Sequence, residues 1–301
     1  MEDDRVVWLD GELIPWVQAT VPLLSHGFSR GSAMFEAFGI HVGPNGPAAF
    51  RMADHLARLA RSAELLEMEL GYSSDEIGAA VGETVRANGM GRGVVKIMAY
   101  WGQETVTELV LDAKLDVAVF AIPENPDLHL DDTTPVSACL SRWRKLHPET
   151  ARPEAKACAN YLNAYLTRKD AIDRGYDVGI MLGTDDLLAE GSIESIFVIK
   201  DGMLRTPPLG RILSSVSRRS VLEIARVEGI PAEETALGAD ALHTADEIFT
   251  SHTGVKVHPV DRFEERTLDA PGPVTRRLIG LVEDILAFRD ERFAHWFEGL
   301  G

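Results

Sequence analysis

The sequence feature that most constrains the fold is a proline-rich, acidic stretch before the middle of the chain. Residues 123–135 read Pro-Glu-Asn-Pro-Asp-Leu-His-Leu-Asp-Asp-Thr-Thr-Pro, with three prolines and four acidic residues. Each proline removes a backbone N–H, and the stretch has little to bury, so neither a helix nor a central strand is expected to run through it. The stretch therefore predicts a linker at 123–135 between a domain at 1–122 and a second domain at 136–301.

Strand and helix patterns alternate in blocks on both sides of this linker. Leu56, Leu59, Ala63 and Leu66 recur at helical spacing. The expected helices span about 53–68, 74–88, 160–174, 217–229 and 274–288. The expected strands are rich in valine and isoleucine and span 94–100, 116–122, 136–140, 178–182, 195–200, 203–206 and 247–250. Blocks of this kind predict two α+β domains.

Charge and cysteine content exclude several classes of protein. The 301 residues carry a formal net charge of −17, so nucleic acid is not an expected partner. An anionic ligand would need a local cluster of positive charge. No apolar run is long enough to span a bilayer, the first residues are acidic, and the two cysteines form no metal-binding or disulfide pattern. We expect a cytoplasmic protein without a metal site or a membrane partner.

Lys156 is the first candidate for chemistry, because its neighbours are small and mostly uncharged (Glu-Ala-Lys-Ala-Cys-Ala-Asn). A lysine whose ammonium is partly desolvated becomes a nucleophile or a carrier of protons. For this segment alone, the alternative is a solvated surface lysine ahead of a helix, which is the commoner state of lysine.

Glu190 and Arg58 are two further charged candidates. Glu190 follows three apolar residues and precedes Gly-Ser and a predicted strand. It would pair with a protonated heterocycle nitrogen, or it is an ordinary loop acid. Arg58 lies beside Leu56 and Leu59 on a predicted helix. Its guanidinium would either reach solvent along the apolar face or pair with an anion.

Two polar turns are candidates for binding an anion. Ser214-Ser-Val216-Ser217 opens a predicted helix, where free N–H groups and hydroxyls attract negative charge. The alternative is a plain serine N-cap. The turn Thr253-Gly254-Val255 follows a predicted strand and would present N–H groups to a carboxylate or phosphate, or it is an ordinary loop.

Together, in this order and spacing, these segments resemble the fold-type IV (class IV) pyridoxal-phosphate (PLP) aminotransferases. That family contains branched-chain and D-amino-acid transaminases, (R)-amine transaminases and aminodeoxychorismate lyase. The motifs are His55-Leu-Ala-Arg58-Leu, Lys156-Ala-Cys-Ala-Asn-Tyr161, Glu190-Gly-Ser and Ile212-Leu-Ser-Ser-Val216-Ser217-Arg. The resemblance covers nearly the whole chain, and it implies the two-domain, D-amino-acid-aminotransferase-like α+β fold with PLP in the cleft between domains.

The resemblance also implies a role for each matching residue. Lys156 would be the Schiff-base lysine, Tyr161 would bond the ring oxygen O3′, and Glu190 would pair with the ring nitrogen. The residues implied to hold the cofactor phosphate are Arg58, Val216, Ser217 and Thr253.

Substrate motifs look most like those of branched-chain transaminases, through Ser32-Ala-Met-Phe35-Glu36 and Ser141-Arg-Trp143-Arg-Lys. The chain departs from them in three places: Arg30 stands for a tyrosine, Lys96 for an arginine, and Thr253-Gly-Val for Thr-Ala-Ala. The lysine at position 96 is similar to that of aminodeoxychorismate lyase, but Trp101 stands where that lyase has an arginine. The arginine and histidine with which D-amino-acid transaminases bind a carboxylate are also missing, since the matching strand has Met98 and Tyr100.

The implied activity is amino-group transfer between a branched-chain or other apolar L-amino acid and a 2-oxo acid such as 2-oxoglutarate. The expected side-chain pocket is lined by Phe35, Trp101, Trp143, Gly254 and Val255, and Arg30 or Lys96 would meet a carboxylate. The alternatives are a D-amino-acid or (R)-amine transaminase or a lyase. A non-catalytic PLP-binding scaffold is disfavoured, because all cofactor residues are present together. The family resemblance implies a homodimer or higher homo-oligomer.

Overall fold

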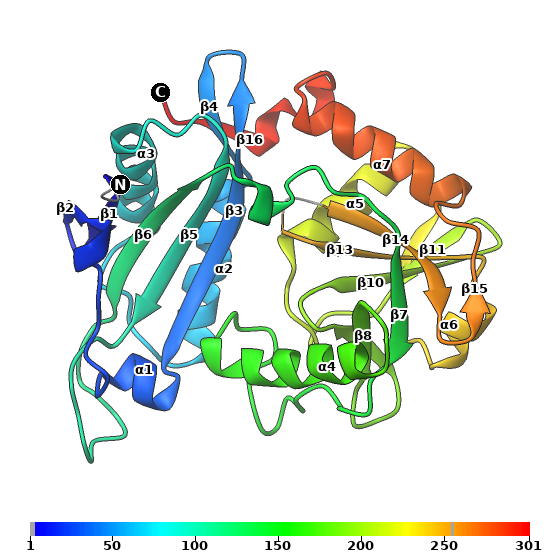
Figure 1. Ribbon diagram of the computed structural model, residues 1–301, viewed down its shortest axis with the longest axis horizontal. Coiled ribbons are helices and arrows are strands. Elements are labelled where there is room, and N and C mark those ends of the chain that lie inside the picture. Colours follow the sequence, from blue (N-terminus) through cyan, green and yellow to red (C-terminus); the bar gives the residue numbers. More distant parts are fainter. Residues whose placement is uncertain (1–3, 254–255) are drawn as a thin grey trace. The chain divides into compact units, whose positions relative to one another are not determined.

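The structure, a computed structural model, describes residues 4–253 and 256–301 and divides into two compact units (Figure 1). The first unit comprises the chain up to Leu130 together with Ala155–Ala159 and Ala287–Gly301. The second comprises Asp131–Glu154 and Asn160–Leu286. This division differs from the boundaries drawn on the sequence, which assign everything after residue 135 to one domain. Two later segments return to the first unit, and one of them carries Lys156.

The first unit is built on a seven-stranded sheet with the order β16-β4-β3-β5-β6-β1-β2. Its strands are β1 (Val6–Leu9), β2 (Glu12–Pro15), β3 (Ala33–Gly43), β4 (Gly46–Phe50), β5 (Gly93–Tyr100), β6 (Asp116–Pro123) and β16 (Phe297–Gly299). Its helices are α1 (His26–Arg30), α2 (Met52–Leu65) and α3 (Ser74–Ala87), with short 3-10 turns η1 (Trp16–Gln18), η2 (Pro126–Leu128) and η4 (Glu291–Trp296).

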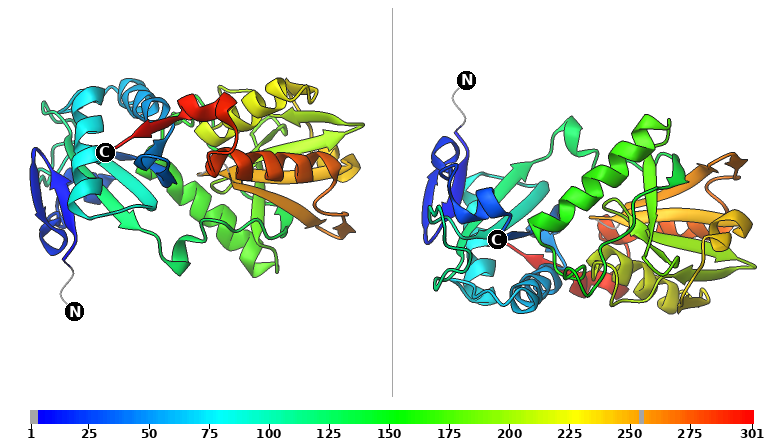
Figure 2. Two further views of the ribbon diagram at one scale, coloured as in Figure 1. Left: turned by 90° about the horizontal axis from the view of Figure 1, so that it is seen from above. Right: turned by 90° about the horizontal axis from the view of Figure 1, so that it is seen from below.

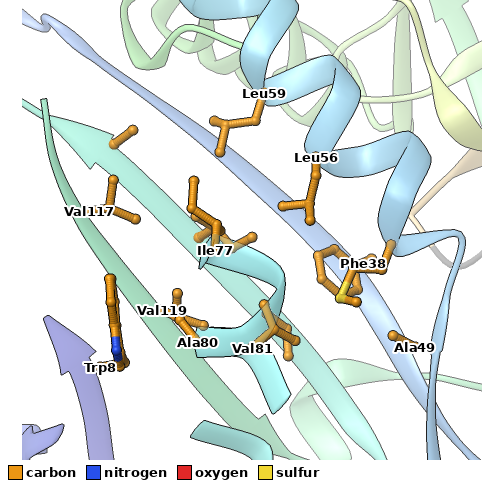
Figure 3. Close-up of a cluster of buried hydrophobic side chains, with 14 of the residues drawn as sticks. Trp8, Phe38, Ala49, Leu56, Leu59, Ile77, Ala80, Val81, Val117 and Val119 are labelled. Carbon is orange, nitrogen blue, oxygen red and sulfur yellow. The ribbon is translucent and has the colours of Figure 1, made fainter. Parts of the chain in front are cut away.

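Helices α2 and α3 pack on one face of this sheet and form its core (Figures 1 and 3). Alternate residues of β5 are buried, as expected for a strand with one face in the core. Helix α3 begins at a capping box, in which Ser73 and Glu76 bond each other's backbone N–H. The labelled core side chains in Figure 3 are Trp8, Phe38, Ala49, Leu56, Leu59, Ile77, Ala80, Val81, Val117 and Val119.

Backbone pairing explains why two late segments belong to the first unit. Ala157 forms a β-bridge with Met34 of β3, and the Phe35 N–H donates to the carbonyl of Lys156 at 3.1 Å. Strand β16 pairs with β4, with Phe297 opposite Phe50. Backbone N–H and C=O groups of β3 and β4 are thereby hydrogen-bonded to segments that are distant in the sequence. Lys156 is therefore positioned by β3.

The second unit contains a nine-stranded sheet with the order β12-β11-β10-β13-β14-β7-β8-β9, in which β15 also pairs with β14. Its strands are β7 (Val136–Leu140), β8 (Val178–Leu182), β9 (Leu188–Gly191), β10 (Ser195–Lys200), β11 (Met203–Thr206), β12 (Ala232–Glu234), β13 (Glu247–His252), β14 (Lys256–Phe263) and β15 (Arg266–Thr267). Its helices are η3 (Cys158–Asn160, which begins in the first unit), α4 (Tyr161–Asp173), α5 (Val216–Val227), α6 (Asp240–Thr244) and α7 (Pro273–Leu286).

Helices pack against this second sheet and close its core. Helix α4 packs on β7 and β8, α6 packs on β10, and α5 and α7 pack on β13 and on each other. Figure 2 shows α7, in orange-red, against the orange strands β13 and β14. Among residues 4–253 and 256–301, no helix has the length and apolar character needed to cross a lipid bilayer.

Candidate active site

Lys156 is buried, with 6% of its surface exposed. Its N–H donates to Ser62 Oγ at 3.0 Å, and its carbonyl accepts from the Phe35 N–H. Its ammonium nitrogen lies 4.6 Å from the centre of the Phe35 ring. The backbone is thus held on both sides, while the amine lies beside an aromatic face. The alternative of a solvated surface lysine does not hold.

A second lysine shares the same aromatic ring. Lys96 Nζ lies 5.0 Å from the centre of the Phe35 ring. Phe35 is paired with Met98 and Ala37 with Lys96 in the β3–β5 ladder, so Phe35 and Lys96 lie on the same face of the sheet. Burial raises the pKa of the nearby Cys158 thiol, and the charges of Lys96 and Lys156 oppose that rise. The structure therefore brings Phe35, Lys96 and Lys156 together in a positively charged cluster.

Arg58 is buried on α2 and pairs with a carboxylate that sequence reasoning did not choose as its partner. Its Nε donates to Glu36 Oε1 at 2.7 Å, and its Nη2 donates to Glu36 Oε2 at 2.6 Å. His55 Nδ1 lies 2.8 Å from Glu36 Oε2. Burial alone would raise the pKa of Glu36, but Arg58 and His55 outweigh it and hold the pKa well below its usual range. The predicted phosphate contact of Arg58 stays a prediction.

Arg30 and Trp101 both hold the loop that joins β5 to β6. The Arg30 guanidinium donates to the carbonyls of Val106 at 2.9 Å and Glu108 at 3.2 Å. The Trp101 indole is 8% exposed, belongs to the first core and donates to the carbonyl of Ala113 at 2.9 Å. Each side chain therefore has a structural role in holding this loop. Their predicted contacts with substrate stay predictions.

In the second unit, Glu190 is buried within β9 and is not a loop acid. Its Oε1 lies 2.5 Å from Lys145 Nζ, and the two side chains are 9% and 10% exposed. The N–H of Leu213 points at the same carboxylate, 3.3 Å from Oε2. Sequence reasoning missed Lys145. The available signal was its position two residues after Trp143, in a chain with only seven lysines.

The two segments expected to bind phosphate meet in the second unit. Ser215 caps α5 by accepting from the Arg218 N–H, as expected of a serine N-cap, so Val216 and Ser217 form the first turn. Ser217 Oγ donates to the carbonyl of His252 at 2.6 Å, which places the start of α5 beside the end of β13. Thr253 follows directly and is half-buried, whereas the predicted Gly254 and Val255 lie outside the described residues.

Trp143 and Tyr161 lie elsewhere in the second unit. Trp143 is 37% exposed, and the Arg142 guanidinium lies 5.5 Å from its ring centre. Tyr161 is the first residue of α4 and is half-buried. Both predicted roles stay predictions.

The residues present fit the three groups by which PLP is held. A buried lysine amine suits the aldehyde, and the buried Glu190 carboxylate suits the ring nitrogen. The first turn of α5 suits the phosphate. The buried hydroxyl of Ser251, just before His252, has no hydrogen-bond partner among the described residues, and a bound anion would satisfy such a donor.

Comparisons with known proteins agree with this chemistry. The family model for class IV amino-transferases matches residues 33–263. The branched-chain-amino-acid aminotransferase of Pseudomonas aeruginosa is 31% identical over 296 residues, which are 97% of this chain and 96% of that protein. The crystal structure of the branched-chain aminotransferase from Thermoproteus uzoniensis with norvaline matches 99% of both chains, with a TM-score of 0.93 and 32% identity.

A further structural relative is described with its cofactor. The branched-chain amino acid aminotransferase from Thermobaculum terrenum in its PLP-form covers 100% of both chains, with a TM-score of 0.91 and 30% identity. The resemblance inferred from the sequence motifs is confirmed by these matches, and the α+β fold expected from it is the one observed. The chain belongs to the class IV aminotransferase family.

Proposed function

We propose that this protein is a PLP-dependent aminotransferase that moves an amino group between a branched-chain or similarly apolar L-amino acid and a 2-oxo acid such as 2-oxoglutarate. The observation that carries the proposal is the buried Lys156, held by β3 and lying beside Phe35 in a chain of this family. The PLP-form of the Thermobaculum relative supports the cofactor. The names of the relatives and the norvaline complex support the apolar amino acid.

PLP, when bound, supplies a conjugated ring that stabilises the negative charge developing at the substrate's α-carbon. The residues proposed to hold PLP are Lys156, Arg58, Tyr161, Glu190, Val216, Ser217 and Thr253.

Lys156 is the base and the acid of the proposed reaction. Its Nζ would take the proton from the substrate's α-carbon and would later return it from the same face, because one group on one face can perform both transfers. Because its backbone N–H and carbonyl are both bonded, the amine moves by rotation of its own side chain. The adjacent Phe35 ring provides an apolar wall for an amine that must change its protonation state.

Glu190 has the role of keeping the cofactor's ring nitrogen protonated. A carboxylate has about four acceptor positions. Lys145 and the Leu213 N–H occupy two of them, so Glu190 retains acceptors for a further donor while the lysine holds its orientation.

Substrate recognition is assigned to apolar side chains and to two cations, Lys96 and Arg30. Phe35 and Trp143, which is 37% exposed, are proposed to contact the side chain of the amino acid. Lys96, whose ammonium shares the Phe35 ring with Lys156, is proposed to meet a substrate carboxylate. Arg30, Trp101, Gly254 and Val255 complete the proposed set.

We also propose that the protein works as a homo-oligomer. Loop residues around Leu24 and Thr105 are bonded to each other, since the Thr105 N–H donates to the Leu24 carbonyl at 3.1 Å. Large apolar side chains are exposed on these two loops and on α1, which follows the first of them: Leu23 77%, Leu24 53%, Phe28 66%, Val106 77%, Leu109 73% and Val110 82%. Apolar surface gathered in this way marks protein interfaces. Light scattering at several concentrations measures the mass, and a monomer would contradict the proposal.

We propose a cytoplasmic location, because the two cysteines form no pattern typical of exported proteins. Fractionation of cells followed by immunoblotting tests it.

The experiment that tests the function is a half-reaction screen. The PLP-loaded protein is mixed in turn with L-amino acids, D-amino acids and amines without a carboxylate, and conversion of PLP to its amine form is followed by absorbance. Branched-chain L-amino acids are expected to react fastest. Preference for D-amino acids or for amines would contradict the substrate assignment, and a purified protein that takes up no PLP would contradict the function itself.

A further inference from the structure

Glu36 is a buried carboxylate to which the proposed function gives no role. It stands on β3 between Met34 and Phe38, and all three residues are 0% exposed. Alternation along the strand makes Glu36 the polar member of an otherwise apolar, core-facing row. Burying a charge is costly unless it is paired and hydrogen-bonded, so the contacts of Glu36 deserve a functional explanation.

We infer that Glu36 is a positioning residue, which together with His55 holds Arg58 in the orientation that binds the cofactor phosphate. The inference rests on the proposed role of Arg58. Glu36 itself touches neither cofactor nor substrate in this proposal. It acts through the arginine.

Glu36 binds Arg58 in a bidentate ion pair. Arg58 Nε and Nη2 each donate to a different oxygen of Glu36, at 2.7 and 2.6 Å. Two parallel bonds fix the plane of a guanidinium, which one bond does not. The direction of Nη1 then follows from the other two nitrogens. His55 Nδ1, 2.8 Å from Oε2, holds the carboxylate in turn.

The same network fixes Arg58 relative to Lys156. His55, Arg58 and Ser62 are three and four residues apart on α2, so they share the helix face that packs on β3. Ser62 Oγ accepts from the Lys156 N–H, and Glu36 joins β3 to Arg58. Arg58 and Lys156, the proposed partners of the cofactor phosphate and aldehyde, are therefore both held by β3 and α2.

Electrostatics agrees with a neutral, well-ordered network. Burial lowers the pKa of His55, and the charges of Arg58 and Lys156 add to this, whereas Glu36 opposes it. Burial therefore favours a neutral imidazole, which can donate one N–H to Glu36. The Glu36 charge balances that of Arg58, so the arginine is kept buried without being drawn to solvent.

The test compares two ligands that differ only in the phosphate. Affinity for PLP and for pyridoxal, which lacks the phosphate, is measured by absorbance after removal of the native cofactor. Glu36→Gln is expected to weaken PLP by about 10- to 100-fold, because an oriented charge-assisted contact is lost. Pyridoxal affinity should change by less than about threefold. Glu228→Gln is the control, since Glu228 pairs with Arg277 between α5 and α7, and it should change neither affinity.

Arg58→Met and the double variant separate the two proposals. If Glu36 acts through Arg58, the double variant should bind PLP as weakly as Arg58→Met alone. Normal PLP affinity in Glu36→Gln, with loss in Arg58→Met, would overturn the positioning role and leave the arginine's role intact. Normal PLP affinity in Arg58→Met would overturn the proposed phosphate contact, and with it this inference. Equal loss of PLP and pyridoxal in Glu36→Gln would also overturn it, because the defect would then be general.

Glu36→Asp carries the test if Glu36→Gln does not fold. Aspartate keeps the charge but is one methylene shorter, so it cannot make both bonds of the bidentate ion pair at the present backbone spacing. A selective loss of PLP affinity in Glu36→Asp supports the inference, and unchanged PLP affinity refutes it.

Discussion

Removal of Lys145 tests how strongly the second unit depends on the buried ion pair at Glu190. Lys145→Met keeps an unbranched side chain, one atom shorter, but deletes its charge. Glu190 is 9% exposed and keeps the long contact from the Leu213 N–H, at 3.3 Å, but loses its counter-charge. The carboxylate must then stay buried without a counter-charge or take up a proton.

The expected cost follows from this burial. Removing one partner of a buried pair destabilises a protein by about 3–5 kcal/mol. For a unit of this size, each kcal/mol shifts the melting temperature by about 2–4 °C, so a drop on the order of 10 °C is expected. The measurement is thermal unfolding of the cofactor-free protein, followed by circular dichroism. Turnover should also fall, because Glu190 loses the group that orients it.

A matched control exists on α4. Lys169 pairs with Asp173 across one helical turn, and both side chains are 53% exposed. An exposed pair of this type contributes only about 0.3–0.5 kcal/mol, so Lys169→Met should melt within about 2 °C of the parent. The double variant Lys145→Met, Glu190→Gln should recover much of the lost stability, because a neutral amide needs no counter-charge. If Lys145→Met melts like Lys169→Met, the pair is not a stabilising feature and the reasoning from burial is wrong.

Three further predictions concern the cofactor site and pH. Lys156→Ala should abolish turnover and the visible absorbance that borohydride removes, and a variant that keeps both would refute its assignment as the cofactor lysine. Arg30→Ala and Lys96→Ala should each raise the KM for amino acids while sparing amines without a carboxylate, and parent-like KM values in both would place recognition elsewhere. Burial, aided by the charges of His258 and Lys256, lowers the pKa of His252 to about 3. Below about pH 6.5 His252 therefore binds a proton in the unfolded chain but not in the folded chain. The free energy of unfolding then decreases as the pH is lowered, by up to ~1.4 kcal/mol per pH unit. His252→Gln should flatten that slope in denaturant titrations between pH 6.5 and 5, and an unchanged slope would contradict the pKa shift.

Local periodicity was sufficient to predict the long elements. Helix α2 was expected over 53–68 and runs over Met52–Leu65, and the strand expected over 94–100 is β5, Gly93–Tyr100. Both carry a repeated apolar pattern whose period identifies the element. Strands such as β9 and β12 were missed, because four or three residues contain too few repeats for a pattern to register.

The order and spacing of the motifs along the sequence were sufficient to identify the family and the expected cofactor lysine. Residues that hold a cofactor recur at similar positions in a family, so they can be matched in the sequence alone. The sequence did not determine how those residues are themselves held. Glu36 is 22 residues from Arg58, and Lys145 is 45 residues from Glu190. Ala155–Ala159 likewise pairs with β3, so Lys156 belongs to the first unit although most of the second half of the chain forms the second. These pairings depend on which strands become neighbours and on which faces are buried. Only the packed chain decides them, since burial is what makes a distant counter-charge necessary.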